Sequence, residues 1–161
     1  MTDDITPYKQ VNGHKVLNIE NDCTYFFVAI ANRLSSSASA RYRKKFGVGI
    51  VEWRCMVMLA MEEGVSAARI SQVGGINKAL VSRSLARLEK LGHVQDHEDT
   101  KRKPRLLQFT ESGRALYDRM LEQALEREEK LREGLSGTEV RELLRMLHIV
   151  SGNVNRLETE R

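Results

Sequence analysis

The sequence predicts a mainly helical protein that carries one short two-stranded β-hairpin. Its 161 residues include only two prolines, and apolar residues recur at three- and four-residue intervals over most of the chain. Hydrophobic residues make up 41% and charged residues 30%, which is typical of a folded globular chain with a core of ordinary size. Two short strand-like segments, 94–98 and 105–109, interrupt the helical pattern and predict the hairpin.

The first half of the chain predicts an arm and two helices. Residues 1–16 are polar and show no helical period, so we interpret them as an N-terminal arm. Residues 17–46 have apolar positions at helical spacing and predict a helix that ends at Gly47, where glycine can adopt the left-handed conformation. A second helix is expected from Ile50 to about Glu63.

A short helix, a glycine turn and a longer capped helix come next, which is the pattern of a helix-turn-helix. Ser66 is the expected cap of the short helix, which a pair of glycines ends. Asn77 is the expected cap of the longer helix over 78–91. Together with the hairpin that follows, these elements predict a winged helix-turn-helix domain over residues 47–110.

The last part of the chain, residues 111–161, predicts two further helices. Thr110 is the expected cap of the first, which is long and highly charged. Ser136 and Glu139 have the spacing of a capping box and begin the second, whose apolar stripe runs over 140–157. A small winged-helix domain cannot cover so long a stripe. We therefore expect a second copy of the chain to bury it, so that residues 17–46 and 111–161 are dimerisation helices of a homodimer.

The predicted helix over 78–91 has a small, polar and basic outer face. Val81, Leu85 and Leu88 share its inner face. The residues that point the other way are Ala79, Arg83, Ala86 and Lys90. Small side chains let a helix enter a major groove, and an arginine there can donate two hydrogen bonds to guanine. The candidate DNA contacts on this helix are Asn77, Lys78, Ala79, Leu80, Ser82, Arg83 and Arg87.

The loop of the hairpin concentrates four positive charges within five positions. Lys101, Arg102 and Lys103 are candidate contacts with phosphate or the minor groove, and Arg105 adds the fourth charge. The net charge of the chain is only +4, so its concentration on helix and hairpin is what favours double-stranded DNA as a partner. The alternative is a winged helix that uses this surface to bind another protein.

Five segments, taken in order along the chain, resemble the MarR (multiple-antibiotic-resistance regulator) family. They are Trp53–Leu59, Ile70-Ser71, Asn77–Arg83, Leu88–Gly92 and Phe109–Leu116. The resemblance covers about residues 20–157 and implies a homodimeric winged-helix transcription factor, by family habit a repressor, that a small ligand or an oxidant releases from DNA. Asp99 is followed by Thr100, where the family often has arginine, so the resemblance does not carry over the ion pair that shapes the family's wing.

The resemblance also implies an effector site between the dimerisation helices and the winged domain. Aromatic and apolar side chains beside arginine would suit an aromatic carboxylate or its thioester. The candidate lining residues are Phe26, Phe27, Ile30, Arg41, Trp53, Arg54 and Met58. The alternative is that aromatic residues at this helical spacing are simply core.

Other kinds of chemistry have little support in the sequence. Cys23 falls about two residues earlier than the reactive cysteine of oxidant-sensing relatives, so a cysteine-based sensor is the less favoured alternative. A cluster of possible metal ligands lies on a predicted strand and its loop, where neighbouring side chains alternate between faces, so we expect no metal site. Its members are His93, Asp96, His97, Glu98 and Asp99. The sequence contains none of the common catalytic or nucleotide-binding motifs, and we predict neither an enzyme nor a cofactor.

The sequence predicts a cytoplasmic protein with no membrane partner. No apolar run approaches the roughly 18 residues that a membrane span needs. The N-terminus is acidic, and no apolar segment of the kind found in signal peptides follows it.

Overall fold

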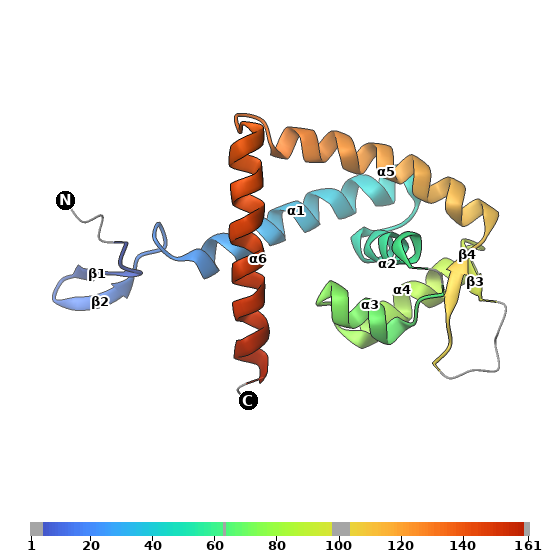
Figure 1. Ribbon diagram of the computed structural model, residues 1–161, viewed down its shortest axis with the longest axis horizontal. Helices are drawn as coiled ribbons and strands as arrows, with labels where there is room; N and C mark the ends of the chain where they lie inside the picture. Colours follow the sequence, from blue (N-terminus) through green and yellow to red (C-terminus); the bar gives the residue numbers. More distant parts are fainter. Residues whose placement is uncertain (1–4, 63, 98–103, 160–161) are drawn as a thin grey trace. The chain divides into compact units, whose positions relative to one another are not determined.

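The computed structural model describes residues 5–62, 64–97 and 104–159. Its elements in chain order (Figure 1) are β1 (Tyr8–Val11), β2 (His14–Leu17), α1 (Cys23–Phe46), α2 (Ile50–Met61), α3 (Ala67–Gly74), α4 (Lys78–Lys90), β3 (Val94–Asp96), β4 (Leu107–Phe109), α5 (Glu111–Leu131) and α6 (Gly137–Thr159). The chain forms two compact units, residues 1–120 and 121–161, and the boundary between them falls within α5. The predicted mainly helical fold with a helix-turn-helix and a small β-wing is confirmed.

The ends of the helices follow from local capping signals. At the start of α3, the Oγ of Ser66 accepts a hydrogen bond from the backbone N–H of Arg69 at 3.2 Å. At the start of α4, the Oδ1 of Asn77 accepts one from the N–H of Ala79 at 3.0 Å. Gly47, with φ at 75°, ends α1 in the left-handed conformation. These are caps that the sequence predicted, and two of them define the boundaries of the helix-turn-helix.

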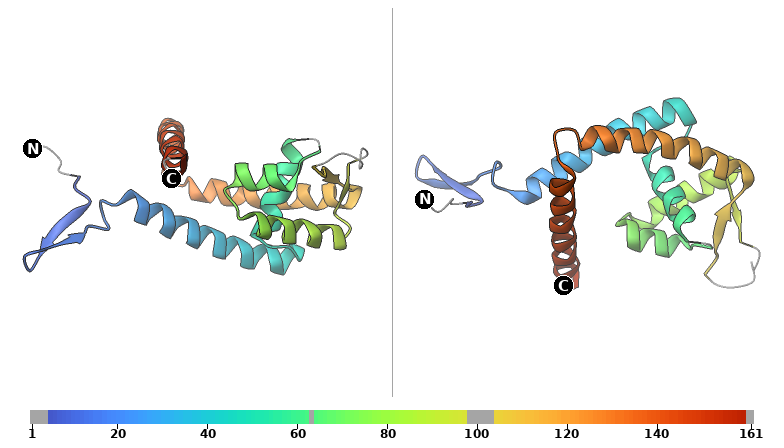
Figure 2. Two further views of the ribbon diagram at one scale, coloured as in Figure 1. Left: turned by 90° about the horizontal axis from the view of Figure 1, so that it is seen from below. Right: turned by 45° about the horizontal axis from the view of Figure 1, so that its top comes forward.

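The core of the first unit lies where α2, α3 and α4 meet. Met56 from α2, Ile70 from α3 and Leu88 from α4 are fully buried. Val81 and Leu85 are buried beside Leu88, so the predicted inner face of α4 is confirmed. Both α2 and α3 pack against α4 (Figure 2), and side chains on the other face of α4, such as Ser82 and Arg83, are exposed.

The wing is a short antiparallel hairpin that a third backbone segment extends. β3 pairs with β4 in the register Val94 to Phe109, and Val65 bridges to Leu107 on the other edge. The paired strands are shorter than the segments that the sequence predicted, although their positions are as expected. The candidate wing contacts Lys101, Arg102 and Lys103 lie outside the described residues.

Residues 8–17 form a β-hairpin where the sequence analysis expected an arm without regular structure. Asn12 and Gly13, with φ at 50° and 79°, make the left-handed turn between β1 and β2. All residues of both strands are exposed, and the ammonium of Lys15 lies 4.5 Å from the centre of the Tyr8 ring. An Asn-Gly pair between two short segments is a strong local signal for a hairpin, and residues 1–16 therefore contain regular structure that their polar composition did not indicate.

The second unit contains the end of α5 and the whole of α6. The predicted capping box is present, because the N–H of Ser136 donates to Glu139 Oε2 at 2.7 Å and the N–H of Glu139 donates to Ser136 Oγ at 3.3 Å. None of the described side chains of α6 is buried, and its apolar stripe, which includes Leu143 and Leu147, is exposed. No helix in the described ranges is both long enough and apolar enough to cross a membrane.

Candidate nucleic-acid interface

The start of α4 presents an exposed face of small and basic side chains. Lys78, Ser82 and Arg83 are exposed, whereas the intervening Val81 is fully buried. All of the contacts predicted on this helix are exposed residues, namely Asn77, Lys78, Ala79, Leu80, Ser82, Arg83 and Arg87. Exposure leaves each of these side chains accessible to a partner.

The turn before α4 is fixed by hydrogen bonds within the helix-turn-helix. The Oγ of Ser71 donates to the carbonyl oxygen of Ile76 at 2.7 Å, and the N–H of Ile76 donates back to the carbonyl of Ser71 at 3.2 Å. Gly75 adopts φ at 58°, a left-handed conformation that favours glycine. This geometry sets the direction in which α4 leaves α3, so the exposed face is held rigidly.

The electrostatics at the start of α4 favour anions. The first turn contains no acidic residue, and Lys78 is the first helical position. The partial positive charge of a helix N-terminus adds to that of the lysine. A phosphate group placed near this end would be attracted by both.

Arg87 differs from the other predicted contacts because its guanidinium is already engaged. Its Nη2 donates to the carbonyl oxygen of Gly47 at 2.9 Å, and its Nη1 lies 3.9 Å from Glu52 Oε1. Glu52 is itself buried and accepts a hydrogen bond from the N–H of Gly49 at 3.1 Å. Arg87 thus ties α4 to the turn between α1 and α2, a contact across 40 residues of sequence that periodicity could not indicate.

Arg105, which the sequence analysis grouped with the wing charges, is also engaged. Its guanidinium bonds to both carboxylate oxygens of Glu89, one at 3.2 Å, and its Nε bonds to Asp96 Oδ1. These two carboxylates raise the pKa of Arg105 further above its ordinary value. Two negative charges therefore offset this arginine, so it adds less to the basic surface than the sequence suggested.

The residues predicted to line an effector pocket do not meet within one chain. Trp53 is core: its ring stacks on Tyr117 with the centroids 5.4 Å apart and meets Tyr42 edge-on at 5.9 Å. Phe26 lies in the first turn of α1, and at about 1.5 Å of rise per residue it is roughly 24 Å along the helix from Tyr42.

The remaining predicted lining residues are also dispersed. Met58 is buried, like Trp53, whereas Arg41 and Arg54 are exposed. Phe27 and Ile30 are exposed beside Phe26 on the first turns of α1. For Trp53 and Met58, the alternative reading of a core position is the one that the structure supports.

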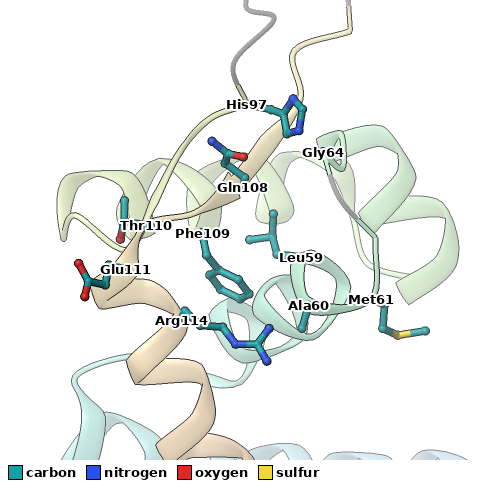
Figure 3. A pocket seen from close by; sticks show the side chains of 10 residues that line it. All are labelled: Leu59, Ala60, Met61, Gly64, His97, Gln108, Phe109, Thr110, Glu111 and Arg114. Carbon is teal, nitrogen blue, oxygen red and sulfur yellow. The ribbon is translucent and has the colours of Figure 1, made fainter.

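A cleft of about 550 Å³ lies between the end of α2, β4 and the start of α5 (Figure 3). Its lining residues are Leu59, Ala60, Met61, Gly64, His97, Gln108, Phe109, Thr110, Glu111 and Arg114. Phe109 and Leu59 point toward its centre, the guanidinium of Arg114 lies below the Phe109 ring, and the carboxylate of Glu111 points away. The volume is within the range of small-molecule sites. None of the residues predicted for the effector pocket lines this cleft. Its walls come from segments far apart in the sequence, which only the folded chain brings together.

The two cysteines differ in environment. Cys55 is fully buried in α2, and burial, with a smaller contribution from Glu52, raises the pKa of its thiol to about 12. The thiolate is the reactive form of cysteine, so Cys55 is chemically inert at neutral pH. Cys23 is exposed at the first position of α1.

The histidines and carboxylates near the wing form no metal site in the part of the chain that the structure describes. There, no group of three or more His, Cys, Asp or Glu side chains is placed to hold a metal ion. His93 instead bonds toward α5, with Nδ1 at 3.4 Å from Ser112 Oγ. Glu98 and Asp99, which belonged to the same sequence cluster, lie outside the described residues.

Comparison with known proteins shows similarity over most of the chain. The MarR family model matches residues 46–103. A MarR/EmrR family transcriptional regulator from Acinetobacter sp. ADP1 is 30% identical, with a TM-score of 0.82 over 87% of this chain and 99% of that chain. No curated protein sequence matches the chain.

Two more distant structures share the fold. The S. aureus MepR–DNA complex has 19% identity and a TM-score of 0.73 over 84% of this chain and 98% of that chain. A Mycobacterium tuberculosis MarR family protein in complex with salicylic acid has 23% identity and a TM-score of 0.64 over 80% and 96% of the respective chains.

Proposed function

Because the chain belongs to the MarR family of transcriptional regulators, we propose that it is a homodimeric repressor that binds a pseudo-palindromic operator. The observation that carries this proposal is the exposed, small and basic face at the start of α4. A two-fold dimer presents two such helices, so the half-sites should lie about 10 base pairs apart. The solved complex of the S. aureus relative with DNA supports the same use of the shared fold.

The exposed stripe of α6 supports the dimer. Leu143, Leu147 and Val154 are large apolar residues that remain 42%, 37% and 47% exposed. Contiguous apolar surface of this kind marks an interaction site in a soluble protein. A second copy of α6 offers the same stripe in a self-complementary, two-fold arrangement.

We assign different roles to helix and wing. Arg83 projects from the outer face of α4 and reads bases in the major groove, whereas Lys101 and Arg102 contact phosphate or the minor groove. Arg87 supports the helix from behind through Gly47, so we assign it a positioning role in place of the direct contact that the sequence suggested.

The test measures binding to the DNA upstream of the protein's own gene and to random DNA, each at two salt concentrations. Arg83→Ala should cost about 1–3 kcal/mol on the operator and little on random DNA. Lys101→Ala should weaken binding to the operator and to random DNA alike. It should also reduce the slope of log affinity against log salt concentration by about one unit. Arg119→Ala, which removes an exposed arginine from α5, is the matched control and should bind like the wild type.

Two outcomes would overturn these assignments. Wild-type protein that binds no DNA even at low salt would favour a winged helix that binds another protein. Equal loss on operator and random DNA for Arg83→Ala would remove base reading from that residue, and Ser82 and Lys78 would be tested next.

We further propose that a small aromatic acid, or its thioester, releases the protein from DNA. We place this effector in the cleft of Figure 3, because the seven residues first predicted for it do not meet in one chain. Phe109 and Leu59 supply an apolar surface there. The guanidinium of Arg114, whose Nε also pairs with Asp118 Oδ1 at 3.2 Å, supplies a cation for a carboxylate. The salicylic acid complex of the M. tuberculosis relative supports the ligand class.

A thermal-shift screen of salicylate, other aromatic acids, their CoA thioesters and phenols tests this proposal. A ligand at 100 times its Kd stabilises the native state by about 2.7 kcal/mol. Arg114→Gln should abolish the shift while Arg119→Gln retains it. A screen without any stabilising compound would overturn the effector, and an unchanged shift in Arg114→Gln would overturn its location.

A further inference from the structure

One guanidinium joins three elements of the winged helix. Arg105 stands two residues before β4, and it bonds to Glu89 in the last turn of α4 and to Asp96 at the end of β3. The contact with Glu89 is bidentate, with one oxygen accepting from each of Nη1 and Nη2. A planar guanidinium fixes direction as well as distance when it binds in this way.

The stability that such a contact adds is small, because all three groups are partly exposed. The side chains of Arg105, Glu89 and Asp96 are 54%, 26% and 39% exposed. Ion pairs this exposed to solvent add little to the stability of the fold. The more informative property is geometric, since the same arginine connects both strands of the wing to α4.

The opposite edge of the wing already has a firm attachment. The N–H of Val65 donates to the carbonyl of Leu107 at 3.1 Å, and the N–H of Leu107 donates back at 3.0 Å. These two hydrogen bonds hold β4 along the edge that faces away from β3. The bonds of Arg105 are a second attachment, which connects the strands to α4.

We propose that Arg105, with Glu89 and Asp96, is a positioning unit that holds the wing at the angle at which helix and wing engage the operator together. The inference rests on the proposed DNA-binding function. The positioning role and the charge of the two carboxylates predict opposite effects on operator binding. Glu89 and Asp96 are negative, so removing them would strengthen binding to phosphate if charge were all that mattered. If they position the wing, removing them weakens binding to the operator.

The decisive variant is the double substitution Glu89→Gln with Asp96→Asn. We expect about tenfold weaker binding to the operator, with binding to random DNA unchanged or tighter. Arg105→Lys keeps the positive charge but loses the bidentate geometry, and it should resemble the double variant. Glu62→Gln, which breaks the exposed ion pair with Arg69 outside the wing, is the matched control and should bind the operator like the wild type.

Unfolding midpoints of all variants are measured in parallel. Midpoints close to that of Glu62→Gln, together with a lower ratio of operator to random affinity, support positioning. Unchanged or tighter operator binding by the double variant overturns the role of Arg105 and leaves the proposed function intact. Failure of the wild type to bind the operator overturns both.

Discussion

Residues 1–120 and α6 use similar apolar periodicity with opposite results. In the first unit, the apolar faces of α2, α3 and α4 meet, and Met56, Ile70 and Leu88 on these faces are fully buried. In α6, Leu143 and Leu147 lie at the same spacing and remain 42% and 37% exposed. The comparison teaches that periodicity predicts a helix with an apolar face, but that it does not tell whether the same chain covers that face.

The two units, residues 1–120 and 121–161, also differ in net charge. Residues 1–120 contain 19 basic and 13 acidic residues, whereas residues 121–161 contain 7 basic and 9 acidic residues. The excess of positive charge thus belongs to the region that carries α4 and the wing. We infer that the first region is built to fold on itself and meet an anion, and the second to meet an apolar partner.

The largest expected effect comes from breaking the core of the first unit. Met56→Ala leaves a cavity among α2, α3 and α4 and should lower the free energy of unfolding by about 2–5 kcal/mol in urea titrations. Met61→Ala is the matched control, because Met61 is exposed at the end of the same helix, and it should stay within about 0.5 kcal/mol of the wild type. Equal losses for the two variants would contradict a core at Met56.

The next effect concerns the α6 stripe. Leu147→Glu should weaken dimerisation by about 1.5–3 kcal/mol, the value of one buried leucine, and sedimentation velocity at micromolar concentrations should detect the monomer. Leu91→Glu makes the same change at an exposed leucine after α4 and should leave the dimer intact. A wild-type protein that already sediments as a monomer would refute the proposed role of α6.

A smaller effect is expected at the cap of α4. Asn77→Ala removes the acceptor for the N–H groups of Ala79 and Leu80 and should cost about 1 kcal/mol of unfolding free energy. Asn77→Gly should cost only a few tenths, because glycine is tolerated at the N-cap position. Guanidinium titrations of both variants measure the difference, and a glycine variant as unstable as the alanine variant would argue against capping.

The sequence predicted most of the fold because its signals are local. Ser66, Asn77 and the Ser136–Glu139 pair each act on backbone groups within three residues, so the starts of α3, α4 and α6 could be predicted without a tertiary structure. The hairpin at residues 8–17 also has a local signal in Asn12-Gly13, but its strands alternate too weakly to be recognised as β-structure.

The candidate site was predictable only in part, for the same physical reason. The exposed face of α4 follows from periodicity, whereas the partners of the arginines on and beside this helix do not. Arg87 bonds to Gly47 and Arg105 bonds to Glu89, at separations of 40 and 16 residues. The stack of Trp53 on Tyr117 likewise depends on how distant helices pack, and it converts a predicted ligand contact into core.

The smallest expected effect is a pH dependence confined to the first unit. His93 is partly buried, and burial together with the positive charge of Arg119 lowers the pKa of its imidazole below the ordinary 6.5. The unfolded chain therefore binds a proton more readily than the folded one, so stability falls as the pH drops below about 6.5 and is unaffected well above it. Urea titrations at pH 7.5 and 5.5 should show a smaller loss of stability for His93→Gln than for the wild type. The same substitution in α6, His148→Gln, leaves His93 in place and should retain the wild-type loss; if it removes the loss instead, the pH dependence belongs to the second unit.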